Sequence, residues 1–293
     1  MDQASGGRAG GVTAGPAAYT SGHVEACGVR LHFLDYGAAG KPPMLCVHGG
    51  AAHAHWFDFV AAGFTADFHV RSLDLRGHGD SAASDPPDYG YGRYAADLDE
   101  VAERLDLRDF VLVGHSMGGM VSLVYAARYP GRMAKLVVVD STMRMTAERI
   151  RSLHDLGARE GSRHESREAF VSRFKLRPSG TLASPDVIAH LAHRSGRQHP
   201  DGHWRHKFDR AVYGTRETID GFDFWARIAA PALLVKGSES GRITPEIEAE
   251  VRARCPHVQV VEVPRSDHHV TLDNPSGFVD AVRPFVTDSA PRS

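Results

Sequence analysis

Short apolar runs and helical patterns alternate along most of this 293-residue chain. Residues 23–26 and 29–36 alternate apolar and polar side chains on either side of Gly28, which predicts an antiparallel hairpin at a sheet edge. Six short segments that are mostly apolar or β-branched follow, each with the length of a strand: 43–47, 68–75, 110–113, 134–139, 231–236 and 258–263. Helical spacing lies between or after several of them, at 94–105, 121–129, 245–253 and 277–286. Such strands need helices on both faces, so the pattern predicts a mainly parallel α/β sheet.

The alternation stops at about residue 141 and resumes with the predicted strand at 231–236. Residues 142–220 are rich in His, Arg and Ser and contain helical stretches without strands, which predicts a helical cap. Its insertion point follows a strand, so we expect the cap to lie over the carboxyl ends of the strands, where open α/β sheets bind ligands. Residues 23–141 and 221–293 then form the core. Residues 1–22 are poor in strong apolar side chains and are expected to be a flexible tail.

The central apolar run leads into Gly114-His115-Ser116-Met117-Gly118, a G-x-S-x-G motif followed by a helical pattern. A strand, a sharp turn and a helix are the context in which this motif presents a nucleophilic serine. A side chain at either glycine would collide with neighbouring backbone in so tight a turn. Ser116 is therefore the candidate nucleophile, at the positive end of the helix that follows.

A serine hydroxyl needs a base to take its proton. His268 follows the last predicted strand and precedes the last helix, which places it at the same sheet edge as Ser116. The chain has 18 histidines, most of which are expected to have no catalytic role. His268 is distinguished from the others only by its position after the last predicted strand. The adjacent His269 is the alternative base.

The reaction also needs donors for a developing oxyanion. One is expected to be the backbone N–H of Met117, directly after the serine. The second should come from the loop after the strand at 43–47, where His48-Gly49-Gly50 allows a ligand to approach the backbone closely. We choose Gly50, with Ala51 as the next candidate.

These motifs together resemble the α/β-hydrolase superfamily of esterase and lipase-like enzymes with a helical cap. The resemblance rests on His48-Gly49-Gly50, Asp74-Leu75-Arg76-Gly77-His78-Gly79, the serine motif and Asp267-His268, in the family's order and spacing. It implies a mostly parallel eight-stranded sheet with helices on both faces and a cap inserted after the sixth strand. It also implies a small-molecule substrate and no cofactor, and it says little about which substrate.

The family's usual position for the triad acid holds no aspartate here. That loop is Gly237-Ser238-Glu239-Ser240-Gly241-Arg242, with Ser240 or Gly241 where the acid normally falls. Two carboxylates could orient the histidine: Asp140, at the end of the strand after the nucleophile strand, and Glu239 in the loop. We favour Asp140 because a residue at a strand end is better fixed than one in a Gly/Ser loop.

Several other side chains are candidates for the pocket or for a metal. Trp56 and His115 are placed at the pocket wall. His48, His53 and His55 have no Cys or carboxylate at ligand spacing, so we expect no metal site. In the cap, Arg205, Lys207 and Arg210 are interpreted as a solvated face.

Composition narrows the possible partners. A formal net charge of −2 argues against a protein built to bind nucleic acid or an anionic membrane. The first residues do not resemble a secretory signal and no apolar run is long enough for a bilayer, so a cytoplasmic location is expected. The three cysteines are expected to be buried free thiols: Cys27, Cys46 and Cys255. A homodimer remains open.

The sequence thus predicts a serine hydrolase that acts on an ester, thioester or lactone of a small to medium organic molecule, in the esterase class (EC 3.1). Ser116, His268 and an acid would form an acyl-enzyme that water then clears. The alternative is a C–C bond hydrolase, lyase or cofactor-free oxygenase on the same fold. A non-enzymatic receptor is disfavoured because the serine, histidine and oxyanion loop are all retained.

Overall fold

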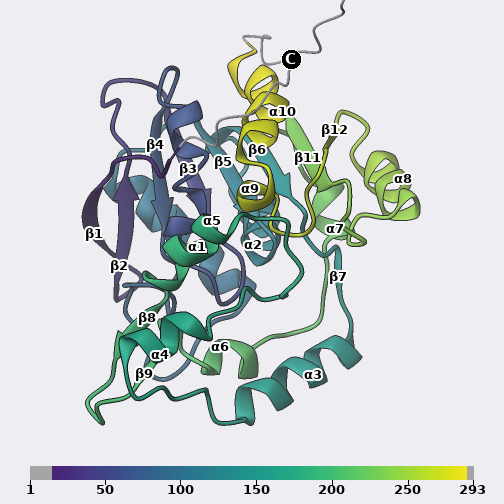
Figure 1. The fold of residues 1–293 in the computed structure, drawn as a ribbon. Helices are drawn as coiled ribbons and strands as arrows, with labels where there is room; N and C mark the ends of the chain where they lie inside the picture. Colours follow the sequence, from purple (N-terminus) through teal and green to yellow (C-terminus); the bar gives the residue numbers. More distant parts are fainter. Residues whose placement is uncertain (1–14, 289–293) are drawn as a thin grey trace, which may run out of the picture.

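The computed structural model describes residues 15–288 and contains a central eight-stranded sheet (Figure 1). The strand order is β1-β2-β4-β3-β5-β6-β11-β12. Their bounds are β1 Thr20–Ala26, β2 Val29–Asp35, β3 Pro43–Val47, β4 His69–Leu73, β5 Phe110–His115, β6 Met133–Val139, β11 Ala232–Gly237 and β12 Gln259–Val263. β2 pairs antiparallel with β1 and β4, and every other pairing in the sheet is parallel. The predicted mostly parallel sheet is confirmed.

Helices cover both faces of this sheet. Successive strand residues face opposite sides, and here both sides are apolar and must be buried. In β5, Leu112 belongs to one apolar cluster, whereas Val111 and Val113 belong to the other. The Leu112 side is covered by α1 (Tyr91–Arg104), α2 (Met117–Arg128), α7 (Phe222–Trp225) and α8 (Pro245–Arg254). The other side is covered by the short 3-10 helices η1 (Ala54–Phe57) and η2 (Ala61–Gly63), by α9 (Val270–Asp273) and by α10 (Pro275–Thr287).

An insertion separates β6 from β11 and forms the cap. It contains β7 (Arg144–Met145), α3 (Ala147–Ala158), α4 (Arg167–Ser172), α5 (Pro185–Ala192), β8 (Gly196–Gln198), β9 (Trp204–His206), α6 (Ala211–Gly214) and β10 (Ile219–Asp220). In Figure 1, α3, α4 and α6 lie together below the sheet. Arg144 pairs with Asp220 and Met145 with Ile219, so the chain enters and leaves the insertion side by side. The helical pattern missed these short strand pairs because two or three residues carry no periodic signal.

Two other expectations need adjustment. Most of the predicted tail lies outside the described residues, but β1 begins at Thr20 inside it, since β2 offers a backbone partner as far as Asp35. All three cysteines are free: Cys46 and Cys255 are buried, whereas Cys27 is only partly so. Within residues 15–288, no helix combines the length and apolarity that a bilayer crossing requires.

Candidate active site

The turn between β5 and α2 holds Ser116 in a strained backbone conformation, with φ of 53° and ψ of −116°. This geometry requires the flanking glycines. A Cβ on Gly118 would lie 2.3 Å from the Val47 carbonyl oxygen, and one on Gly114 would lie 2.4 Å from the Gly118 carbonyl oxygen. Both contacts are far inside van der Waals distance and involve backbone, which cannot move aside. The turn therefore projects Ser116 from the sheet edge, as the motif predicts.

His268 lies in the loop between β12 and α9, where its imidazole meets two of the predicted partners. The Nε2 atom is 3.0 Å from the Ser116 hydroxyl oxygen, and the Nδ1 atom is 2.7 Å from Asp140 Oδ2. The structure thus brings the three residues together from separate segments. His269 instead donates from Nε2 to the Pro178 carbonyl oxygen at 2.8 Å, which links the loop to the cap.

The two candidate acids have different surroundings. Asp140 directly follows β6 and is fully buried, and besides His268 it accepts a hydrogen bond from the Ser240 hydroxyl at 2.8 Å. Glu239 is exposed, and its carboxylate accepts a hydrogen bond from the hydroxyl of its neighbour Ser238. Ser240 stands where the family usually has the acid. In this chain it supports the carboxylate of the adjacent strand instead.

Burial also determines the charge state of this pair. It lowers the pKa of His268 to about 2, with the charge of Arg242 as the next contribution. Burial raises the pKa of Asp140, and the hydrogen bond from Ser240 opposes that shift. A neutral imidazole that donates from Nδ1 to Asp140 leaves Nε2 free to accept a proton from Ser116. This is the protonation state a general base requires.

The predicted oxyanion donors lie close to each other and border the same cavity as the serine. Met117 begins α2, and Gly50 belongs to the loop after β3; both border the same cavity as Ser116. Within the described part of the chain, neither backbone N–H donates a hydrogen bond to protein. The loop approaches closely, since a Cβ on Gly49 would lie 3.1 Å from the Ser116 Cβ. Both N–H groups are therefore available to a ligand.

The cavity measures about 690 Å³ and is bordered by core residues, including Ser116 and His268, and by cap residues. Two residues that we placed at its wall do not line it. Trp56 packs in the core beneath, 3 % exposed, with its ring edge-on to His53 at 4.9 Å between centroids. His115 is 1 % exposed and donates from Nε2 to the His268 carbonyl oxygen at 2.8 Å. The turn directs Ser116 outward and leaves the preceding side chain behind it, under the His268 loop.

Sequence reasoning also missed the charged part of the cavity lining. Six of the described residues that border it are basic, and none is Asp or Glu. They are Arg149, Arg173, Lys175, Arg177, Arg216 and Arg242. The three basic residues singled out earlier are elsewhere: Arg205 pairs with Asp201, Lys207 with Asp80, and Arg210 donates to the Leu156 carbonyl oxygen. The abundance of arginine in residues 142–220 was the available signal.

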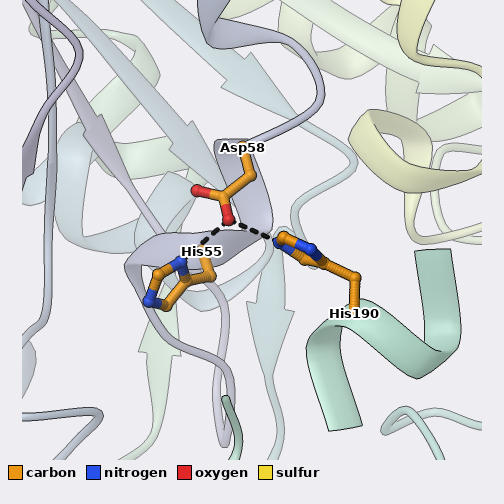
Figure 2. Close-up of side chains that lie close together, drawn as sticks. All are labelled: His55, Asp58 and His190. Atoms are coloured by element: carbon orange, nitrogen blue, oxygen red, sulfur yellow. Dashed lines mark hydrogen bonds and ion pairs between the residues drawn. The ribbon is translucent and has the colours of Figure 1, made fainter. Parts of the chain in front are cut away.

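A second histidine cluster joins the core to the cap (Figure 2). Asp58 Oδ2 accepts from His55 Nδ1 at 2.8 Å and from His190 Nε2, on α5, at 2.6 Å. Our expectation that His55 has no carboxylate at ligand spacing was therefore wrong. The possible ligand atoms of these three side chains lie close enough together to hold a metal ion. However, Asp58 also accepts from the Tyr36 hydroxyl and lies 3.8 Å from Arg194 Nε, so hydrogen bonds and charge already satisfy it.

The family relationship agrees with this geometry. The alpha/beta hydrolase fold family matches residues 42–275, well over half of the chain. The chain therefore belongs to the alpha/beta hydrolase fold family, and its relatives include hydrolases.

Several curated relatives, including a deformylase and an esterase, span most of the chain. It is 28% identical over 270 residues to N-formylmaleamate deformylase of Pseudomonas putida, covering 90% of this chain and 96% of that one. It is 28% identical over 247 residues to the esterase Rv0045c of Mycobacterium tuberculosis, covering 83% and 82%. Among solved structures, E-2-(acetamidomethylene)succinate hydrolase superposes with a TM-score of 0.81 at 24% identity, covering 92% of this chain and 100% of that one. That last likeness shows the fold alone.

Proposed function

We propose that this protein is a serine hydrolase that cleaves a carboxylic ester, thioester or lactone of a small to medium organic molecule. The observation that carries the proposal is the continuous hydrogen-bonded series from Ser116 through His268 to Asp140. A cavity of about 690 Å³ bordering the serine is in the size range of small-molecule sites. The esterase relative supports the same bond class.

In the proposed mechanism, His268 Nε2 takes the proton of Ser116 as its oxygen attacks the substrate carbonyl carbon. The N–H groups of Gly50 and Met117 stabilise the resulting oxyanion, and Asp140 stabilises the imidazolium. His268 then gives its proton to the leaving group. Water, activated by the same imidazole, hydrolyses the acyl-enzyme and regenerates the serine.

No observation in the structure favours C–C bond hydrolysis, a lyase reaction or cofactor-free oxygenation over this chemistry. The complete base and acid relay supports hydrolysis. The buried thiols of Cys46 and Cys255 support our proposal of a reducing compartment, with the cytoplasm as the expected location.

Covalent labelling tests the nucleophile directly. A fluorophosphonate probe should modify Ser116, as located by peptide mass spectrometry, and should fail on Ser116→Ala. The same variant should lose about 10⁴-fold or more in kcat on short-chain p-nitrophenyl esters. Modification at another serine, or turnover that survives in Ser116→Ala, would contradict the proposal.

A further inference from the structure

Arg216 is a buried cation with no anionic partner among residues 15–288. Its side chain lies over the rings of Tyr91 and Tyr94, with the guanidinium carbon 5.3 and 5.8 Å from their centroids. The residue is 6 % exposed, and its Nη1 atom is buried with no hydrogen-bond partner in the described structure. Buried charges are ordinarily paired, because desolvation is otherwise too costly. The protein thus maintains a positive charge that no described carboxylate neutralises.

The position of Arg216 explains what this charge could act on. It lies between α6 and β10 in the cap, and its Nη2 atom contacts the sulfur of Met117. Met117 directly follows Ser116, and both border the same cavity as Arg216. The unpaired guanidinium therefore lies next to the residue that follows the proposed nucleophile, in the same cavity as His268.

Four of the other basic residues of the lining add to this positive charge, whereas the half-buried Arg242 lies 3.9 Å from Asp140 Oδ2. Arg149, Arg173, Lys175 and Arg177 are exposed, and no acidic residue accompanies them in the lining. A cleft lined by charges of one sign concentrates ligands of the opposite sign and speeds their entry. The arrangement has an exposed cationic mouth and one buried cation at depth.

We propose that the substrate carries a carboxylate and that Arg216 pairs with it inside the cavity. This inference rests on the proposed function only for the kind of bond that is cleaved. Binding of the carboxylate to Arg216 does not depend on the proposed function. The guanidinium packs over two tyrosine rings, and the edge of such a planar group matches the two oxygens of a carboxylate. A phosphate group would satisfy the same donors, and the experiment separates the two.

Binding is measured by calorimetry on Ser116→Ala, which cannot turn the ligand over by the proposed route. The ligands are the monoethyl esters of succinate, glutarate and adipate, each compared with its neutral diethyl ester. At least one monoethyl ester should bind about 10- to 100-fold more tightly than its diethyl counterpart. Adding Arg216→Gln should remove that preference, and Arg216→Lys should restore part of it. Arg167→Gln is the matched control: a cap arginine over a tryptophan ring that does not border the cavity.

Several results would overturn the inference. They are equal binding of both esters across the series, a preference that persists in Arg216→Gln, or a loss as large in Arg167→Gln. If inorganic phosphate displaces the monoethyl ester and glutarate does not, the group that Arg216 binds is a phosphate and not a carboxylate. Carboxylate-dependent binding in a protein that hydrolyses none of these esters would contradict the proposed function and leave this inference standing.

Thermal unfolding gives an independent readout. If Arg216 serves a ligand, Arg216→Met should not lower the melting temperature, because it removes an uncompensated buried charge. A purely structural arginine would show the opposite, with a loss of stability and no change in ligand preference.

Discussion

The two walls of the cavity are built differently. On the core side, the reacting groups follow the ends of neighbouring strands: Ser116 follows β5 and Asp140 follows β6. Both residues have positive φ, 53° and 44°, which only a rigid surrounding structure can maintain. On the cap side, the lining includes four exposed basic side chains: Arg149 on α3, and Arg173, Lys175 and Arg177 in the segment after α4.

This difference separates chemistry from recognition. Strand ends fix atoms to the accuracy that proton transfer needs. Loops and helix ends can change the identity of a side chain without disturbing the sheet. We therefore expect substitutions on the core wall to lower kcat, and substitutions on the cap wall to change which substrate is accepted. The predictions that follow test this division and the contact between core and cap, beginning with the largest effect.

Asp140→Asn should lower kcat by about 10⁴-fold with little change in KM, because an amide cannot hold His268 in the required tautomer. Glu239→Gln is the matched control and should change kcat by less than about two-fold, since this residue is exposed. Steady-state kinetics on one ester measures both. A large loss in Glu239→Gln with little change in Asp140→Asn would identify Glu239, in the loop after β11, as the acid. It would also contradict the view that strand ends hold the reacting groups.

Asp58→Asn tests the hydrogen bond from His190 of the cap to Asp58 of the core. It should reduce the free energy of unfolding by about 1–3 kcal/mol, because His55 and His190 lose a shared buried acceptor. Urea unfolding at pH 7 measures this, and exposed Asp223→Asn should have almost no effect.

The same contact predicts a pH dependence. Burial raises the pKa of Asp58, but the hydrogen bonds from His190 and His55 outweigh it and bring the pKa to about 2. Because folding lowers this pKa, the Asp58 carboxylate contributes fully to the free energy of unfolding above the unfolded-state pKa of 3.8. That contribution is lost as the pH falls through about 2. The difference between wild type and Asp58→Asn should narrow in that window. A constant difference would show that the carboxylate charge is irrelevant.

Arg242→Gln should have the smallest effect. Burial and then the charge of Arg242 lower the pKa of His268, which must be neutral to act as a base. The acidic limb of the kcat/KM profile should therefore lie below pH 6.5 in the wild type and move to higher pH in the variant. Arg254→Gln, outside the cavity lining, should leave the limb in place. A shift to lower pH would contradict the electrostatic argument.

The sequence determined what depends on neighbours along the chain. The alternation of strands and helices, the point of insertion and the turn around Ser116 all follow from local spacing and from glycines that admit no side chain. It also identified Asp140 as a candidate acid, because the usual loop visibly lacks one. The position at a strand end favoured Asp140 over Glu239, but only the fold brings one of these carboxylates to His268.

Tertiary packing decided the rest. Burial distinguishes Asp140 from Glu239, and a distance of 3.0 Å distinguishes His268 from His269. The cationic lining gathers residues from 149 to 242, which only the folded cap brings to one cavity. Trp56 and His115 lie beneath that cavity because side-chain direction at a sharp turn depends on the sheet behind it. Contacts between distant segments carry no periodicity, so no reading of local pattern could supply them.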